Sequence, residues 1–379
     1  MTGLLENCFV IDVTEGAQGP FAATLLADLG ATVLKVERPE GELMRHGVGP
    51  RKQGVPMPML SICRGRVASL ALDLKSESGR DRLLDLLSTA DVFLENWRPG
   101  AAKRLGLARE DLKAVNPRLI YLSASGFGST GPFARLGSMD SIAAASGGLS
   151  GVSGERNGRS ERYRLALLDF VSGMVTGEMA LAAVLRRELS GEGGWAETSQ
   201  LESAAAVAGS MINEPDGGQP AGSSDRWAVP SCMVAAADGV VVALHADDDI
   251  QWRTLADALG LLDVDGWSGV AARRADRERV EQAVADAAAG LSSGELLARL
   301  DAAGVPGAVV HRSLGAAMDD REISDTHVVW RRSHVGWVAM ARPPWRFADV
   351  EVHAGRPCPP LDTAIVPDWQ EEWGKHGES

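Results

Sequence analysis

Short apolar runs alternate with amphipathic segments along the first part of the chain. An apolar run rich in β-branched residues, 8–13, is followed by a glycine-containing turn and by a segment, 21–29, whose apolar residues recur at helical spacing. Gly30 follows as a residue type that ends helices, and a second β-branched run covers 32–36. Strand, helix and strand in this order form a βαβ unit, which predicts parallel strands.

The same alternation continues to about residue 130. The predicted strands are 70–74, 91–95 and 119–125, and the predicted helices lie at 78–89 and 102–107. Strands that alternate with helices over this length are typical of an open, doubly wound sheet. We therefore expect an α/β fold with an open, doubly wound large domain.

The pattern changes after residue 140. The chain is predicted to be helical to 189, with a glycine- and serine-rich interruption at 147–160 that we expect to form a surface loop near a site. A long helix covers 168–189. Beyond 225 the pattern predicts a hairpin at 231–244 with Asp238-Gly239 at its turn, helices at 250–259, 274–289 and 293–303, and a strand at 305–310.

A segment rich in glycine, proline and serine separates these two patterns. The predicted domains are a large α/β domain over 1–212, a linker over 213–224, a small α+β domain over 225–325, and a return to the large domain over 326–379. The linker contains the sequence GGQPAGSS.

Composition and charge exclude several classes of protein. Hydrophobic residues make up 45% and charged residues 23% of the 379 positions, as in ordinary globular proteins. The formal net charge of −13 argues against nucleic acid or an anionic membrane as the main partner. No uninterrupted apolar run approaches the length of a membrane span, and the first residues lack the features of a secretory signal. We expect a cytoplasmic protein.

Cysteine and histidine spacing gives no indication of a metal site. The four cysteines, Cys8, Cys63, Cys232 and Cys358, form no CxxC pair, and the seven histidines form no HExxH or similar motif. A disulfide framework is not expected in such a chain, and no metal is expected.

Polar and cationic side chains follow several of the predicted strands. The turn after the first strand reads EGAQGP rather than GxGxxG, so a dinucleotide site is not supported. The carboxyl ends of parallel strands open onto one crevice, so cationic side chains there could hold a phosphate-bearing ligand. The alternative is that these side chains are solvated surface charges, and their position alone favours this alternative. The residues concerned are Glu15, Gln18, Arg38, Lys75, Asn96, Trp97, Arg98 and Arg104.

Asp169 stands at the start of the long predicted helix, between the apolar run 165–168 and Phe170. Aspartate is a preferred N-cap residue, which is sufficient reason for its presence. A nucleophilic carboxylate has to stay ionised, and a helix N-terminus favours the charged form. The structural and the catalytic interpretation are compatible, and the pattern alone favours the structural one.

Six segments together resemble the class III CoA-transferases, the family of carnitine–CoA and formyl-CoA:oxalate transferases. Each is weak alone, but they occur in order over nearly the whole chain. They are VIDVTEGAQGPFAATLLADLGATVLKVERPEGE, LDLKSESGRDRLLDLLSTADVFLENWRPGAAKRLGL, NPRLIYLSASGFGSTGP, LLDFVSGMVTGEMALAAVLRRELSGEGG, LDAAGVPGAVV and ARPPWRF.

The resemblance implies a fold and partners. Both chain ends would build the Rossmann-like large domain, the small domain would be inserted, and two subunits would interlock as a homodimer. Acyl-CoA and a carboxylate would be the substrates, with CoA along the crevice of the large domain. The matching CoA contacts are Arg38, Leu72, Lys75, Asn96, Trp97 and Arg104, with Arg38 and Lys75 as phosphate partners and Asn96 and Trp97 beside the adenine.

Asp169 falls on the family's catalytic aspartate. The resemblance implies that its carboxylate forms an anhydride with the donor acyl group and then a thioester with CoA, so that neither ATP nor a metal is needed. Backbone N–H groups of the EGAQGP turn could stabilise the oxyanion. The acyl pocket or oxyanion site would include Ala17, Gln18, Met139 and Asp140.

Two departures from the family pattern bear on function. Related racemases carry a GHD motif where this chain reads Gly137-Ser138-Met139-Asp140, and Met139 cannot move a proton. Gln18 stands beside Ala17, the position where some transferases have their glutamine. A CoA-transferase is the leading hypothesis; the alternatives are a racemase or isomerase, a lyase on the same scaffold, and a CoA-binding subunit without activity.

Overall fold

The computed structural model describes residues 3–47, 51–52, 55–56, 59, 62–154, 165–208, 228–262, 264–350, 352 and 355–362. The predicted linker, 213–224, lies outside these residues. The chain divides into two compact units, of which the first comprises Met1–Asp216 with His327–Ser379 and the second comprises Gly217–Thr326. Each unit is described by itself.

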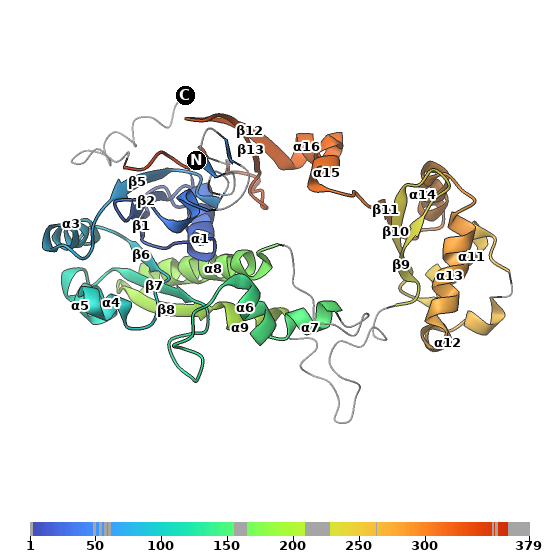
Figure 1. The fold of residues 1–379 in the computed structure, drawn as a ribbon, viewed down its shortest axis with the longest axis horizontal. Coiled ribbons are helices and arrows are strands. Elements are labelled where there is room, and N and C mark those ends of the chain that lie inside the picture. Colours follow the sequence, from blue (N-terminus) through green and yellow to red (C-terminus); the bar gives the residue numbers. More distant parts are fainter. Residues whose placement is uncertain are drawn as a thin grey trace. The chain divides into compact units, whose positions relative to one another are not determined.

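A six-stranded parallel sheet forms the centre of the first unit (Figure 1). Its order is β5-β2-β1-β6-β7-β8, so the chain winds outward in one direction from β1 and then in the other from β6. The predicted parallel α/β sheet is confirmed. The strands are β1 (Phe9–Asp12), β2 (Thr32–Glu37), β5 (Val67–Ala71), β6 (Val92–Glu95), β7 (Ile120–Ser125) and β8 (Gly194–Ser199).

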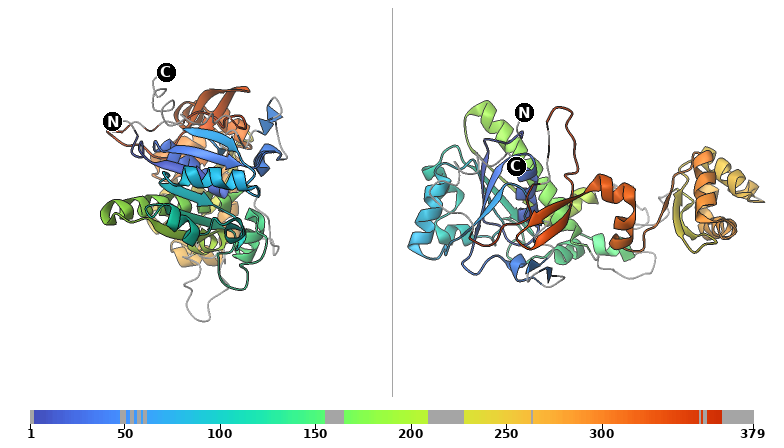
Figure 2. Two further views of the ribbon diagram at one scale, coloured as in Figure 1. Left: turned by 90° about the vertical axis from the view of Figure 1, so that its left-hand side faces the viewer. Right: turned by 90° about the horizontal axis from the view of Figure 1, so that it is seen from above.

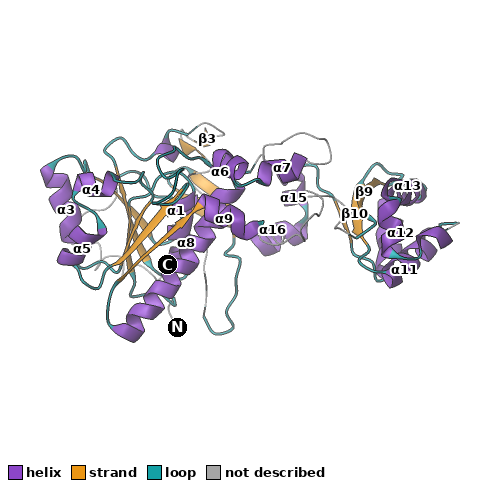
Figure 3. Cartoon of the chain, turned by 90° about the horizontal axis from the view of Figure 1, so that it is seen from below, coloured by secondary structure: helices purple, strands orange, loops and turns teal. Residues whose placement is uncertain are grey.

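Helices cover both faces of this sheet, as Figure 3 shows. In β1, Val10 faces a core cluster that α1 and α8 complete, whereas the next residue, Ile11, faces the cluster formed with α3 and α5. Both residues are fully buried, as strands between two helix layers require. The helices are α1 (Gln18–Asp28) and α8 (Leu167–Ser190) on one face, and α3 (Glu77–Leu87), α4 (Ala101–Leu105) and α5 (Arg109–Val115) on the other.

Further elements of the first unit surround the sheet. A C-terminal hairpin contributes Val329, Val338 and Met340 to the core cluster that contains Val10, and Figure 2 shows it beside the strands. These elements are η1 (Leu43–Arg45), β3 (Arg51–Lys52), β4 (Val55–Pro56), α6 (Asp140–Ser146), α7 (Leu149–Gly154), α9 (Gln200–Val207), β12 (Val328–Ser333) and β13 (Gly336–Ala341).

The second unit is a small antiparallel sheet covered by helices. Its strand order is β11-β10-β9, and the turn between β9 and β10 contains Gly239 at a φ of 78°, a conformation that glycine adopts freely. The predicted hairpin is therefore present. The elements are β9 (Ser231–Ala235), β10 (Val241–His245), α11 (Asp249–Leu259), η4 (Asp265–Trp267), α12 (Val270–Ala275), α13 (Arg277–Ala288), α14 (Ser293–Ala302), β11 (Gly307–Val309), α15 (Leu314–Asp319) and α16 (Arg321–His327).

Several predicted elements differ from the structure in their bounds, among them two in the first unit. The third strand, expected at 70–74, is β5 at Val67–Ala71, because Val67 to Ala71 pair with β2 and the chain then turns at Asp73. Alternation of apolar and polar residues continues beyond the last paired residue, so the pattern could not place the end. Within the loop expected at 147–160, residues 149–154 form α7.

Among the described helices, α8 alone is long and apolar enough to cross a membrane by length and composition. The expectation that no spanning helix is present considered only uninterrupted apolar runs, and α8 contains Asp169, Glu178 and Arg186 among others. Core helices pass the same test, and α8 contacts α1, β7 and β8. We therefore interpret α8 as a helix of the layered unit.

Candidate active site

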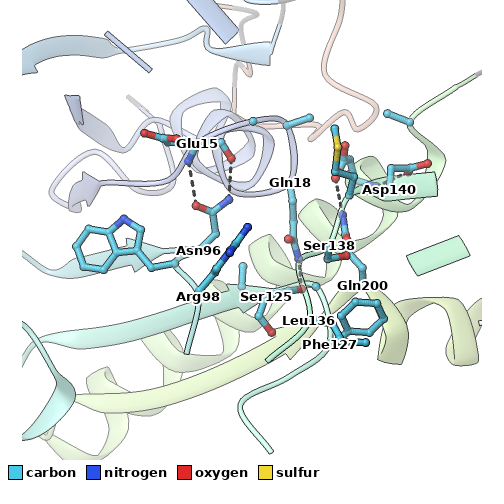
Figure 4. A pocket seen from close by; sticks show the side chains of 18 of the residues that line it. Glu15, Gln18, Asn96, Arg98, Ser125, Phe127, Leu136, Ser138, Asp140 and Gln200 are labelled. Carbon is cyan, nitrogen blue, oxygen red and sulfur yellow. Dashed lines mark hydrogen bonds between the residues drawn. The ribbon is translucent and has the colours of Figure 1, made fainter. Parts of the chain in front are cut away.

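A cavity of about 550 Å³ lies at the carboxyl ends of β1, β6 and β7. It is located where the strand order reverses between β1 and β6, which is the point where open α/β sheets bind ligands. Figure 4 shows side chains from the loops after these strands and from α6 and α9 converging on it. Lining residues include Glu15, Gly16, Ala17, Gln18, Asn96, Trp97, Arg98, Ser125, Ser138, Met139, Asp140, Asp169 and Gln200.

The turn after β1 is held by side chains from other segments. Asn96 accepts the N–H of Glu15 at 2.9 Å and donates to the carbonyl oxygen of Glu15 at 2.7 Å. The N–H of Gly16 donates to Oε2 of Glu42 at 3.0 Å. Beneath the turn, the buried Nζ of Lys35 donates to the carbonyl oxygen of Thr14 at 2.8 Å. The turn is thus fixed in position before any ligand binds.

These contacts limit which backbone N–H groups of the EGAQGP turn can donate hydrogen bonds to a ligand. The N–H groups of Glu15 and Gly16 are engaged with Asn96 and Glu42. Those of Ala17 and Gln18 lie at the start of α1, where N–H groups have no partner inside the helix, and within the described residues no acceptor faces them. Ala17 and Gln18 therefore supply free donors of the turn at the cavity wall.

Asp169 lies in the first turn of α8, and Ala166 rather than Asp169 is the N-cap residue. The helix was predicted to begin at 168 but begins at Leu167, so Asp169 lies inside it and does not cap it. Oδ2 of Asp140 accepts the N–H groups of Leu168 at 2.6 Å and of Asp169 at 3.1 Å. The Asp140 side chain therefore satisfies two N–H groups in the first turn of α8, as the side chain of an N-cap residue does in other helices.

The Asp169 carboxylate has a second polar neighbour. Nε2 of Gln200, the first residue of α9, donates to Oδ1 of Asp169 at 2.5 Å. Oδ1 of the aspartate is thereby engaged, and no donor among the described residues contacts Oδ2. The hydroxyl of Ser138 donates to Oε1 of Gln200 at 2.9 Å, which completes a chain of three side chains.

The pKa of Asp169 is raised to about 6. Burial is the largest cause and the nearby charge of Asp140 adds to it, whereas the hydrogen bond from Gln200 opposes them. We expected the helix N-terminus to favour the ionised form, but Asp140 already accepts the N–H groups there. At pH 7 the carboxylate is still mainly ionised and is more basic than an exposed aspartate.

Small residues allow these elements to meet. A Cβ on Gly126, just after β7, would lie 2.0 Å from Cβ of Ser138, and a Cβ on Gly147 would lie 2.6 Å from Cβ of Ala204 in α9. Glycine is therefore required at both positions for α6, α9 and the end of β7 to approach.

The structure brings most of the predicted site residues together. Ala17, Gln18, Met139, Asp140 and Asp169 all line the cavity. Of the six predicted CoA contacts, Asn96 and Trp97 line it as well.

The other four predicted CoA contacts lie outside the cavity lining. Arg38 pairs with the carboxylate of Glu15, with both oxygens 2.6 Å from Nη2. Leu72 packs against the core cluster on the α3 face. Lys75 and Arg104 are exposed. Lys75 is further from the sheet than expected because β5 ends at Ala71.

Gln200 was missed by the sequence analysis. It directly follows β8, so the rule that carboxyl ends of parallel strands face the site would have found it had it been applied to that strand. Ser138 appeared only as part of a motif, and its role depends on Gln200. Within the part of the chain that the structure describes, no group of three or more histidine, cysteine, aspartate or glutamate side chains could hold a metal ion.

Comparisons with known proteins agree on one family. The sequence profile described as CoA-transferase family III matches residues 5–364. A succinyl-CoA:mesaconate CoA-transferase of Haloarcula hispanica is 32% identical over 95% of this chain and 94% of its own. A succinate–glutarate CoA-transferase of Agrobacterium fabrum is 31% identical over 80% and 78% of the two chains. The crystal structure of Rv3272 from Mycobacterium tuberculosis superimposes with a TM-score of 0.83 at 26% identity, covering 95% and 98% of the chains.

Proposed function

The chain belongs to CoA-transferase family III, and on that premise we propose that Asp169 is the nucleophile with which it moves CoA from an acyl-CoA donor to a carboxylate acceptor. The observation that carries the proposal is the position of the Asp169 carboxylate. It lines the cavity at the switch point of the sheet, and its pKa near 6 leaves it ionised and nucleophilic at neutral pH.

The proposed reaction is a double displacement. An oxygen of Asp169 attacks the thioester carbon, the C–S bond breaks, and the CoA thiolate leaves an aspartyl–acyl anhydride. The thiolate then attacks the aspartyl carbon and expels the donor carboxylate, giving an aspartyl-CoA thioester. The acceptor carboxylate reverses both steps with its own acyl group. The thioester energy is retained on the enzyme throughout.

The start of α1 supports the first displacement. The N–H groups of Ala17 and Gln18 are free donors of the turn, and both residues line the cavity. We assign to them the oxyanion that develops on the donor carbonyl, where fixed backbone donors act without reorganisation.

The proposed path of CoA passes Asn96 and Trp97. Trp97 offers a ring at the cavity wall for the adenine, and Asn96 holds the turn beside it. Arg38, Leu72, Lys75 and Arg104 stay proposed contacts for the outer part of CoA. A phosphate that binds Arg38 has to compete with Glu15, which holds that guanidinium in two hydrogen bonds.

The acyl group is proposed to be a short dicarboxylic one. The relatives named above act on succinyl, mesaconate and glutarate groups. Arg98 is a cation in the cavity wall that could bind a second carboxylate, and the absence of a side chain at Gly137, whose Cβ would lie 3.3 Å from Arg98 Nη2, leaves it room. Met139 lines the same space with an apolar surface.

We further propose that the enzyme is a cytoplasmic homodimer. Leucine and methionine side chains of α8 are exposed on one chain, among them Leu185 at 61% and Leu189 at 82%. A second copy would cover such a surface. The four cysteines are free thiols, which suits a reducing compartment.

Trapping tests the proposal. The protein is mixed with succinyl-CoA, quenched with hydroxylamine and digested, and a hydroxamate at Asp169 is expected by mass spectrometry. The Asp169→Asn variant should form none and lose transfer while keeping its circular dichroism spectrum. Transfer retained by that variant would refute the assignment, and deuterium exchange at the α-carbon without transfer would indicate a racemase instead.

A further inference from the structure

Resting on the proposed function, we propose that Gln200 is a second catalytic residue: its amide donates to the oxyanion that forms on Asp169 itself whenever the aspartyl carbon is attacked. Nε2 of Gln200 is 2.5 Å from Oδ1 of Asp169. The backbone N–H groups of Ala17 and Gln18 stabilise the oxyanion on the substrate carbonyl, and the amide of Gln200 stabilises the oxyanion on Asp169. The two groups of donors therefore act in different steps of the reaction.

The hydrogen bond assigns different roles to the two oxygens of Asp169. Oδ1 is held by Gln200, so Oδ2 is the oxygen available for attack on the donor thioester. In the anhydride that results, Oδ2 bridges to the acyl group and Oδ1 is the carbonyl oxygen. Gln200 then already donates to the atom that will carry the next negative charge.

The second displacement develops charge on this atom. The sulfur lone pair of the CoA thiolate forms a bond to Cγ of Asp169, and the π electrons of the carbonyl move to Oδ1. When the carbonyl re-forms, the Cγ–Oδ2 bond breaks, and the electron pair leaves on the donor carboxylate, with no proton transferred. Attack of the acceptor carboxylate on the aspartyl-CoA thioester places charge on Oδ1 in the same way. Gln200 stabilises both transition states.

Ser138 positions the amide for this role. An ionised Asp169 only accepts hydrogen bonds, so the NH₂ group of Gln200 has to face it and Oε1 has to face Ser138. The Ser138 hydroxyl donates to Oε1 at 2.9 Å, and the Gln200 side chain is buried, with only 4% of the residue exposed. The donor is therefore oriented before the reaction begins, which is what makes oxyanion stabilisation effective.

A Gln200→Met variant tests the proposal, because methionine has a similar length and no N–H. Wild-type and variant proteins are mixed with succinyl-CoA alone in a rapid-quench instrument, and the burst of free succinate and the aspartyl-CoA thioester are measured. We expect the burst rate and kcat to fall about 10²–10³-fold with little change in KM. Ser138→Ala should lower kcat less, by about tenfold, and it tests the proposal independently should Gln200→Met not fold.

A pH profile separates this role from a purely electrostatic one. Gln200 also lowers the pKa of Asp169, so its loss raises that pKa and removes ionised nucleophile at neutral pH. That deficit disappears at about pH 9, where Asp169 is ionised in both proteins, whereas loss of the oxyanion donor persists. Recovery of wild-type kcat by Gln200→Met at that pH would overturn the proposal.

The control is Gln282→Met on α13, where Nε2 donates to Oδ1 of Asp286 at 2.7 Å on the surface. This variant removes a matched glutamine–aspartate hydrogen bond and should react like the wild type. Absence of an Asp169 adduct in the wild-type protein would refute the proposed function. An adduct that forms equally fast in the wild type and in Gln200→Met would refute only the role of Gln200.

Discussion

Oδ2 of Asp140 accepts the backbone N–H of Asp169 at 3.1 Å, so the carboxylate that orients the nucleophile also repels its charge. Burial is the largest cause of the raised pKa of Asp169, and the charge of Asp140 adds to it. The helix N–H groups that would stabilise Asp169 are occupied by Asp140.

Replacing Asp140 with asparagine should separate its hydrogen bonds to the start of α8 from the effect of its charge on Asp169. Asparagine keeps an oxygen that accepts the N–H groups of α8 but carries no charge, so the pKa of Asp169 should fall from about 6 toward its ordinary value. The acid limb of the pH profile of kcat/KM should move to lower pH. Asp286→Asn, on the surface of the second unit, is the control, and an unchanged acid limb in Asp140→Asn would contradict the assignment.

Asp169→Asn should stabilise the protein while it abolishes transfer. The folded pKa of Asp169 is raised, so the folded chain binds the proton more tightly than the unfolded chain, and stability is lost as the pH rises through about 6. At about pH 7.5 the ionised side chain costs roughly 1–2 kcal/mol after allowance for its partial exposure. We expect Tm to rise by a few degrees at that pH, and a smaller rise at about pH 4. A lower Tm at neutral pH would show that the charge is compensated.

Gly126→Ala should impair catalysis through Ser138. The added Cβ would lie 2.0 Å from Cβ of Ser138, so that side chain has to move away from Gln200. We expect a fall in kcat of at least tenfold, comparable with that of Ser138→Ala. Gly294→Ala, where nothing lies within 4 Å of the new Cβ, should be active. Equal activity of both variants would mean that the loop after β7 shifts to accommodate the added Cβ without displacing Ser138.

Arg98→Met should act on acceptor selectivity. If Arg98 binds the distal carboxylate of a dicarboxylic acceptor, its loss removes a charge-assisted hydrogen bond, which corresponds to about a 10–100-fold fall in kcat/KM for succinate or glutarate. Acetate, with one carboxylate, should be unaffected. Arg253→Met on α11 provides the control. A loss shared equally by dicarboxylic and monocarboxylic acceptors would instead place Arg98 at CoA.

Much of the site was predictable from local patterns. β1 and β2 are short β-branched runs that both helix layers bury, so the parallel sheet could be inferred from periodicity alone. Residues that follow parallel strands lie at the carboxyl edge of the sheet, which predicts Gln18 and Asn96 in one crevice. Both line the cavity. Lys75, which the same rule also predicts at this crevice, does not line the cavity, because β5 ends at Ala71 and alternation did not show that end. Its contact with CoA stays a prediction.

By itself, the sequence determined the α/β class, the family and the candidate aspartate, because periodicity and ordered motifs are properties of neighbouring residues. Only the tertiary structure decided what surrounds Asp169. Asp140 and Gln200 are 29 and 31 residues away along the chain, and they meet the nucleophile where glycines at 126 and 147 let α6, α9 and the end of β7 approach. A pKa and an oriented hydrogen bond depend on such distant neighbours, and no local pattern encodes them.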